Sequence, residues 1–470
     1  MTSSRRSFLK KSAAASVAVS SIPYVWTSEA SARSCYDDQL TVAAIGVGGS
    51  RGRYNRGGNV SRQAAKFGKM IAVCDVDQLH TAEFNADERF EGKLKEYVDY
   101  RKMIDTEKPD IVVIGTNDHW HVPIATYALR AGCDVYCEKP LTLTIDEGKD
   151  ICNVVKETGR VFQVGTQQRT EMGQMFLKAV ALVQGGYIGD NVKAHIAIGS
   201  APGEGPFENT PTPEKLDWDF WVGPARSADY SLERRKFFRW YMEYSGGKMT
   251  DWGAHHIDIA QWAIGKDQTG PVNISGTGKF GNVVPAGFNW VDFFDGKAEL
   301  ENGYNAATKF NLDLTFDNGS VLNVNDEYVS KDGKTKFPNG ILFTGSKGRF
   351  FVNRGKLTGK PVEELTESDN KNLEEAMAKL YKNKPITSHM QNFFECVKDR
   401  SEPVSDVYSH HRTMTSCHMC NIALMVGEDL KWDLVKEEFI GNEMANRLKS
   451  RARRDKFLGE PKMQLQNASS

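Results

Sequence analysis

The sequence predicts an α/β fold in which a doubly wound parallel sheet is followed by an α/β domain with a large, mostly antiparallel open sheet. Two observations predict it. Short apolar stretches alternate with helical stretches from residue 40 to residue 165, which is typical of parallel strands joined by crossover helices. Beyond residue 165, long loops and hairpin signals replace the alternation. With 470 residues, 40% of them hydrophobic, the chain can bury the cores of two domains.

Five apolar stretches have the length and composition of buried parallel strands. They are Leu40–Ile45, Met70–Cys74, Ile111–Gly115, Asp134–Cys137 and Val161–Gly165. One helix is expected from His121 to Ala131, before Gly132. The next is expected to begin at the capping box formed by Thr144 and Glu147 and to end at Gly159.

The second domain is expected to consist largely of hairpins. Residues 309–316 and 321–325 predict two strands joined by a turn at 317–319, and a second hairpin is expected to turn at 345–348. A helix is expected from Ser405 to Val426. It contains Cys417-His418-Met419-Cys420, but no second CxxC accompanies this motif, so core packing is favoured over a zinc or redox site. The other cysteines, such as Cys74 and Cys137, are also expected to be buried thiols.

The N-terminus resembles a twin-arginine export signal. Ser4-Arg5-Arg6-Ser7-Phe8-Leu9-Lys10 precedes a weakly apolar stretch that is shorter than the roughly 20 residues of a membrane span. Ala30-Ser31-Ala32 offers a cleavage site, which places the mature start near Arg33. These features predict an exported, periplasmic protein without a stable membrane anchor.

Charge gives no indication of a nucleic-acid partner. Removal of residues 1–32, with four basic residues and one acidic residue, changes the formal net charge from −1 to −4. The only cationic cluster lies between Arg447 and Lys456, and we interpret it as a solvated helix face.

A glycine-rich turn follows the first predicted strand, with the sequence Gly46-Val47-Gly48-Gly49-Ser50-Arg51-Gly52. Such turns let backbone N–H groups approach a pyrophosphate, although here the third glycine of the GxGxxG pattern, Gly52, comes one residue late. Asp75 ends the second strand, where a carboxylate can bind an adenosine ribose. The acid favours NAD. Arg51 or Arg53 could offset its charge, so NADP stays open.

Polar residues also follow the third predicted strand, in Thr116-Asn117-Asp118-His119-Trp120-His121. They lie where a doubly wound sheet binds its ligands, but a simple N-cap for the next helix explains Thr116 to Asp118 equally well. His119 and His121 have a possible metal-ligand spacing. No carboxylate and histidine partners follow at the intervals that zinc enzymes use, so we expect no metal site.

Two further segments suggest proton-transfer chemistry. Lys139 in Glu138-Lys139-Pro140 lies just past a predicted strand end, where its ammonium can reach a substrate oxygen near a nicotinamide. If the chain is helical from about Asp251, then His255 lies one turn further on the same face, as expected for a general base oriented by a carboxylate. A helix whose polar residues satisfy buried partners is an equally good interpretation of the second segment.

Taken together, these motifs resemble the glucose–fructose oxidoreductase and inositol dehydrogenase family (Gfo/Idh/MocA), in its exported branch with twin-arginine signals. The resemblance covers nearly the whole mature chain. Besides the segments above, it includes the following residues: Gly165-Thr166-Gln167-Gln168-Arg169, Trp218-Asp219-Phe220-Trp221-Val222-Gly223-Pro224, Gly246 to Asp258, and Lys431-Trp432-Asp433.

The resemblance implies a signal over residues 1–32, an NAD(P)-binding Rossmann domain over 33–165, a substrate and oligomerisation domain over 166–435, and a helical tail over 436–470. It implies that Lys139, Asp251 and His255 are catalytic, with His255 as the base. The implied cofactor-binding residues are Gly46, Gly48, Gly49, Asp75, Thr116, Asn117, His121, Glu138, Lys139 and Gln167. Arg169, Trp221 and His256 are candidates for substrate binding, and His256 is a second candidate for the base.

These inferences predict an exported NAD(P)-dependent oxidoreductase that acts on a sugar hydroxyl and forms a homo-oligomer, either a dimer or a tetramer. Because free nicotinamide cofactor is scarce outside the cytoplasm, the cofactor is expected to be tightly bound and loaded before export by the twin-arginine machinery. One alternative is an NAD-dependent glycoside hydrolase or epimerase that works through a transient keto sugar. Another is a non-catalytic carbohydrate-binding protein with a vestigial cofactor site.

Overall fold

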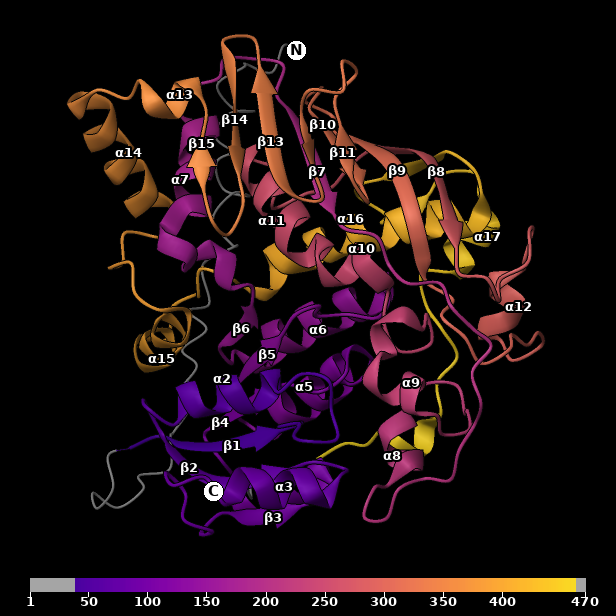
Figure 1. Ribbon diagram of the computed structural model, residues 1–470. Helices are drawn as coiled ribbons and strands as arrows, with labels where there is room; N and C mark the ends of the chain where they lie inside the picture. The colour runs from indigo at the N-terminus through magenta and orange to yellow at the C-terminus, as the bar shows by residue number, and fades with distance from the viewer. Residues whose placement is uncertain (1–38, 462–470) are drawn as a thin grey trace, which may run out of the picture. The chain divides into compact units, whose positions relative to one another are not determined.

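The computed structural model describes residues 39–461, so the predicted signal segment lies outside the described residues. Figure 1 shows the elements of this part of the chain. Its first sheet is parallel, with the strand order β3-β2-β1-β4-β5-β6 of a doubly wound fold. The strands are β1 (Thr41–Ile45), β2 (Lys69–Cys74), β3 (Lys95–Tyr97), β4 (Ile111–Ile114), β5 (Asp134–Glu138) and β6 (Phe162–Gly165).

Helices cover both faces of this sheet because its buried residues alternate in direction along each strand. Val42 and Val113 face α2 (Arg56–Ala64) and α15 (His389–Asp399). Their neighbours Ala43 and Val112 face the opposite cluster. That cluster includes residues of α4 (Tyr100–Glu107) and α5 (His121–Arg130), whereas α3 (Gln78–Asn85) packs beside β2 and β3.

Thr144 caps α6 (Ile145–Thr158) as predicted, but Glu147 does not complete a capping box, because its carboxylate bonds the residue before the N-cap. Thr144 Oγ1 accepts from the Glu147 N–H at 3.3 Å, and Glu147 Oε2 accepts from the Leu143 N–H at 2.6 Å. Gly159 ends the helix in the left-handed conformation, with φ of 62°. Local sequence therefore determines both ends of this helix.

The second sheet has the strand order β15-β14-β13-β7-β10-β9-β8-β16-β17. Strands β7 and β10 are parallel, and all other neighbouring strands of this sheet are antiparallel. Its strands are β7 (Lys193–Ile198), β8 (Asn273–Phe280), β9 (Ala307–Thr315), β10 (Val321–Asn325), β13 (Asn339–Gly345), β14 (Gly348–Val352), β15 (Leu357–Thr358), β16 (Leu430–Asp433) and β17 (Glu438–Phe439). The predicted hairpins β9–β10 and β13–β14 are confirmed, as is the α/β fold class. A small sheet pairs β11 (Tyr328–Val329) with β12 (Lys336–Phe337).

One face of the second sheet packs against helices, as Figure 1 shows. These helices are α7 (Met175–Gln184), α11 (Gly253–Ala263) and α16 (Val407–Val426). Cys417 and Cys420 of α16 are fully buried free thiols, and burial raises the pKa of both. The CxxC motif therefore belongs to the core, as predicted. On the other face of the sheet, β9 exposes Lys309, Asn311 and Asp313.

The remaining elements connect and flank these layers. They are α8 (Trp218–Val222), α9 (Leu232–Lys236), α10 (Gly247–Asp251), α12 (Trp290–Phe294), α13 (Lys360–Glu363), α14 (Glu367–Leu380), α17 (Glu443–Arg447) and the 3-10 turns η1 (Asp118–Trp120), η2 (Gln167–Arg169), η3 (Met172–Gln174), η4 (Phe238–Trp240) and η5 (Asp455–Phe457). Among residues 39–461, no helix combines the length and apolar character needed to cross a membrane.

The C-terminal segment differs from the predicted helical tail with a solvated basic face. After α17 the chain forms no further helix or strand up to residue 461, apart from the short 3-10 turn η5. Arg453 pairs with Glu147 at 2.9 Å, and Arg454 pairs with Asp219 of α8. The basic residues are therefore used to attach this segment to α6 and α8, because carboxylates on those helices face it.

Candidate active site

The glycine-rich turn after β1 brings the start of α2 close to two strand ends. Gly46 has φ of +74°, and a Cβ on Gly57 would lie 1.9 Å from the Gly46 carbonyl oxygen. Gly57, at the start of α2, is therefore the glycine that permits close packing of helix and strand. Gly52, the third glycine of the motif in the sequence, lies instead in the loop of residues 49–55 that precedes the helix.

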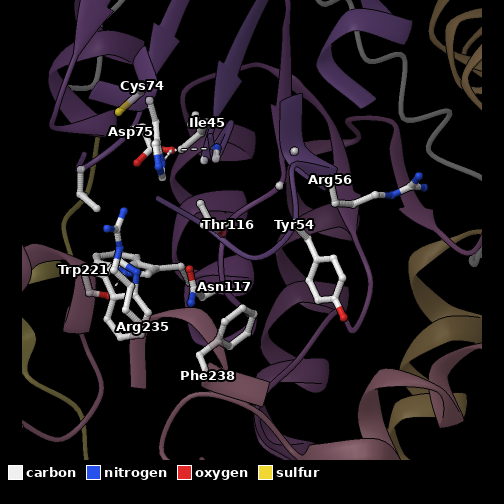
Figure 2. Close-up of a pocket in the computed structure, with 18 of the residues that line it drawn as sticks. Ile45, Tyr54, Arg56, Cys74, Asp75, Thr116, Asn117, Trp221, Arg235 and Phe238 are labelled. Carbon is white, nitrogen blue, oxygen red and sulfur yellow. Dashed lines mark hydrogen bonds and ion pairs between the residues drawn. The ribbon is translucent and has the colours of Figure 1, made fainter. Parts of the chain in front are cut away.

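Asp75 follows β2, as predicted for a ribose-binding carboxylate. Its Oδ2 accepts from the Gly48 N–H at 3.0 Å and its Oδ1 accepts from the Asp77 N–H at 3.0 Å. Figure 2 shows Asp75 beside Ile45 at one side of a cavity that Thr116 and Asn117 also line. Gly49 lies behind the turn, where a Cβ would contact Glu83 and His80. Asp75 is thus held in place by the glycine turn itself.

We call this space the glycine-loop cavity. It extends from the glycine turn to Asp75, and part of it is open to solvent. Its walls come from two parts of the chain, the part that contains the first sheet and the part that contains the second sheet. The first part contributes Ile45, Asp75 and Thr116, and the second contributes Trp221, Arg235 and Phe238 (Figure 2).

A second cavity adjoins the first, and we call it the Lys139 cavity. The three predicted catalytic residues, Lys139, Asp251 and His255, all line it. The two cavities share the following wall residues: Tyr54, Arg56, Gly115, Thr116 and Arg239. A dinucleotide in the first cavity can therefore present one end to the second, which is the arrangement that hydride transfer requires.

Lys139, immediately after β5, is held by Asp251. Its Nζ donates to Asp251 Oδ1 at 2.6 Å and to the Asp251 carbonyl oxygen at 2.9 Å. Arg239 Nε lies 3.3 Å from the same Oδ1. Burial alone would raise the pKa of Asp251, but the charges of Lys139 and Arg239 outweigh it and hold this pKa well below its usual range. Asp251 is therefore a fixed anion that orients Lys139.

His255 lies on α11, and the structure corrects the expected role of Asp251. No hydrogen bond joins His255 to Asp251 in the described chain, and His255 Nδ1 is buried without a partner. Burial, followed by the charges of Lys139 and Arg354, lowers the pKa of His255 well below its usual value. His255 is therefore a neutral imidazole at neutral pH. It is oriented by packing against Trp252 and not by the predicted carboxylate.

The remaining predicted cofactor residues brace the wall of the Lys139 cavity. Glu138 Oε1 accepts from Gln167 Nε2 at 2.9 Å and pairs with Arg56 at 3.1 Å. The two ring nitrogens of His121 lie 2.6 Å from the Pro140 carbonyl oxygen and 3.1 Å from that of Thr116. Glu138 thus positions Arg56.

The three candidates for substrate binding lie elsewhere than expected. Arg169 is 2% exposed and makes a bidentate ion pair with Asp258 at 2.6 and 2.8 Å. His256 is fully buried between Gln168 and Asn339. Neither side chain lines the Lys139 cavity. Trp221 stacks on Trp218 at 4.4 Å and lines the glycine-loop cavity.

Sequence reasoning missed several wall residues, among them Arg239 and Arg354. Arg239 lies in the run Arg234-Arg235-Lys236-Phe237-Phe238-Arg239, which spans the end of α9 and the start of η4, and its mixture of basic and aromatic residues was the available signal. Arg354 is one arginine of a hairpin turn, and nothing in its local sequence marks it. Among residues 39–461, no cluster of three or more His, Cys, Asp or Glu side chains is placed to hold a metal ion.

Substitution of Gly57 by alanine tests the glycine turn. We expect about a 10- to 100-fold weaker affinity for NAD, because the added Cβ must displace α2 and overpacking costs about 1–3 kcal/mol. Titration of the purified variant with NAD measures this. Gly270→Ala is the control, since its Cβ would meet only Leu434 at 3.7 Å. Equal affinities of the two variants would contradict the assignment of Gly57.

Comparison with known proteins agrees with this geometry. Residues 40–166 match the family described as "Oxidoreductase family, NAD-binding Rossmann fold" (GFO_IDH_MocA), and residues 200–280 and 347–458 match its "C-terminal alpha/beta domain". The D-glucoside 3-dehydrogenase of Escherichia coli (strain K12) is 25% identical over 362 residues, covering 74% of this chain and 89% of that protein. An inositol 2-dehydrogenase of Salmonella typhimurium is 28% identical over 27% of this chain and 37% of its own length.

Solved structures share the fold at low identity. The WlbA dehydrogenase from Bordetella pertussis, in complex with NADH and UDP-GlcNAcA, has a TM-score of 0.58 and 15% identity, covering 84% of this chain and 99% of that chain. The myo-inositol 2-dehydrogenase from Lactobacillus plantarum has a TM-score of 0.52 and 18% identity, with the same two coverages.

Proposed function

Because the chain belongs to the Gfo/Idh/MocA family of NAD-binding oxidoreductases, we propose that it oxidises a secondary hydroxyl of a sugar or sugar derivative, or reduces the corresponding ketone. The observation that carries the proposal is the position of Lys139. Asp251 holds its ammonium at 2.6 Å, in a cavity that shares a wall with the glycine-loop cavity. NAD suits the glycine-loop cavity because both Asp75 and the backbone of the glycine turn line it, as in dinucleotide-binding folds.

Proton transfer at this site is divided between two side chains. When bound, NAD supplies the acceptor for the hydride from the substrate carbon. Neutral His255 accepts the hydroxyl proton, and the Lys139 ammonium donates a hydrogen bond to the same oxygen as negative charge develops on it. In the reverse direction His255 returns the proton to the oxygen.

A polyhydroxylated substrate suits the Lys139 cavity. Its wall includes the amides of Asn55, Asn59 and Gln167 and the ring of Trp252, which together offer donors, acceptors and an apolar face. The names of the relatives, a glucoside 3-dehydrogenase and an inositol 2-dehydrogenase, support the same substrate class.

The proposal includes export and a retained cofactor. The twin-arginine motif at Ser4 to Lys10 supports export of the folded protein to the periplasm, where an exchangeable NAD would be lost. Assembly into a dimer or tetramer is part of the same proposal and rests on the family resemblance.

Contacts of residues 214–239 support cofactor retention. This segment, which we call the strap, contributes Trp221, Arg235 and Phe238 to the glycine-loop cavity. It is attached at the end of β2, where the Gln78 N–H donates to the Lys215 carbonyl at 3.0 Å and the Asp217 N–H donates to the Val76 carbonyl at 2.9 Å. The buried Arg235 also pairs with the fully buried Asp77.

Arg235→Ala is expected to release NAD at least about tenfold faster. Loss of the guanidinium leaves the buried Asp77 carboxylate poorly compensated, which weakens the closed strap, and a tenfold change corresponds to about 1.4 kcal/mol. Exchange of bound NAD for isotope-labelled NAD measures the rate. Arg89→Ala, which breaks an exposed pair with Asp87, is the control. Identical exchange rates in the Arg235 and Arg89 variants would contradict the role of the strap.

The activity itself is tested on the purified full chain. The protein is denatured to identify any released nucleotide, and the native form is incubated with neutral and acidic sugars and their glycosides. A change in nicotinamide absorbance with one sugar, reversed by another, supports the oxidoreductase. Release of an aglycone without net redox change would indicate the hydrolase or epimerase instead. If NAD neither copurifies nor binds, the proposal fails and a binding role is favoured.

A further inference from the structure

One cationic side chain in the wall of the Lys139 cavity has no ion pair within the described part of the protein. Four cationic side chains line it. Three are in ion pairs within the protein: Arg56 with Glu138 at 3.1 Å, Lys139 with Asp251 at 2.6 Å, and Arg239 with Asp251 at 3.3 Å. The fourth, Arg354, has no carboxylate within 4.0 Å among residues 39–461.

Arg354 is nevertheless held in a defined position. It lies in the turn between β14 and β15, and its Nε and Nη2 donate to Gln168 Oε1 at 3.3 and 3.2 Å. Its guanidinium carbon lies 4.5 Å from the centre of the Trp252 ring, which also lines the cavity. Stacking and hydrogen bonds together restrict the side chain before any ligand binds.

The amide that holds Arg354 is itself fixed from the core. Gln168 is fully buried and its Nε2 donates to His256 Nδ1 at 3.3 Å. His256 Nε2 then donates to Asn339 Oδ1 at 3.1 Å. Burial lowers the pKa of His256 to about 4, so it is the neutral tautomer that this chain of bonds requires. His256, predicted to contact substrate, is thus a positioning residue for Arg354.

The guanidinium retains unused donors toward the cavity. Of its five N–H groups, those on Nη1 and one on Nη2 have no partner among the described residues. The wall also contains two acids without an ion pair among the described residues, Asp118 and Glu171, and burial raises the pKa of both. Neither forms an ion pair with the guanidinium, so the free N–H groups of Arg354 remain available to a ligand.

We propose that the substrate is a carboxylate-bearing sugar, such as a uronic acid or its glycoside, and that Arg354 binds the carboxylate. This inference rests on the proposed function. A planar carboxylate matches the fork of one guanidinium. A phosphate dianion carries two charges, and Arg354 is the one wall cation without an ion pair among residues 39–461 to balance them.

The test compares the neutral sugar with the corresponding uronic acid. The probes are the methyl glycosides of D-glucose and D-galactose, each beside the methyl glycoside of its uronic acid, together with D-gluconate. For the native protein we expect a kcat/KM at least about tenfold higher for an acid than for its neutral partner, because charge-assisted bonds contribute about 1.5–3 kcal/mol.

Arg354→Gln should lower kcat/KM for the acid at least about tenfold, mainly through KM, so that the preference over the neutral sugar disappears. Arg354→Lys, which keeps the charge but loses the fork, should retain part of the preference. Arg349→Gln is the matched control, because Arg349 is exposed on the neighbouring strand β14 and lines neither cavity. It should leave both rates unchanged.

Different results would contradict the carboxylate inference and the proposed oxidoreductase function. If the native protein turns over neutral sugars as well as or faster than every acid, or if Arg354→Gln lowers both rates equally, the carboxylate inference is wrong while the oxidoreductase proposal stands. If no sugar of either kind changes the nicotinamide absorbance, the proposed function itself fails.

Discussion

Replacement of Lys139 by alanine should lower kcat by about 100- to 10,000-fold while NAD stays bound. The ammonium donates to Asp251 at 2.6 Å in the cavity that also contains His255, so its loss removes the hydrogen-bond donor expected at the substrate oxygen. The glycine turn and Asp75 contact each other without Lys139, which is why cofactor affinity should persist. Single-turnover absorbance of the nicotinamide measures the chemical step, and analysis of released nucleotide measures the bound NAD.

Two further variants identify what Lys139 contributes. Lys139→Arg keeps a positive charge but changes its reach, so partial activity would indicate an electrostatic role. Lys193→Ala removes an exposed lysine at the start of β7 and should have no effect. If the Lys139→Ala and Lys193→Ala variants turn over at the same rate, the site proposed here is not the catalytic site.

Replacement of Arg169 by alanine should cost about 3–5 kcal/mol of unfolding free energy, because it leaves the Asp258 carboxylate buried without its partner. The guanidinium makes two bonds to Asp258, a third to the Val404 carbonyl at 2.9 Å and a fourth to Ser409 Oγ at 3.2 Å. It also lies over the Trp262 ring at 4.8 Å. Denaturant unfolding of the purified variant measures the loss.

The control is Arg130→Ala, whose partner Glu460 is largely exposed, so the expected loss is at most about 1 kcal/mol. The double change of Arg169→Met with Asp258→Leu should recover much of the stability, because it removes both buried charges. If Arg169→Ala instead keeps its stability and raises KM for the sugar, Arg169 is a substrate residue, as the sequence had suggested.

Local patterns in the sequence predicted the fold class and most elements of the first sheet. Apolar stretches and caps depend on neighbouring residues only, and this holds for α6, where Thr144 and Glu147 define the start. Strand β3 was missed because it has three residues, of which Lys95 and Glu96 are exposed, so it carries no hydrophobic pattern. The same limit applies to the C-terminal segment, whose basic residues look solvated until their carboxylate partners on α6 and α8 are known.

At the site, local motifs indicate which residues are catalytic candidates, whereas contacts between distant segments set how these residues pair. Asp251 and His255 are close in sequence, so a hydrogen bond between them was expected. Asp251 instead binds Lys139, which is 112 residues away in the sequence. Arg169 and Arg354 both have the chemistry to bind a substrate. Only the fold places the first beside the buried Asp258 and the second at an open cavity. Pairing and burial depend on contacts between distant segments, and these contacts are set by packing of whole elements rather than by any local motif.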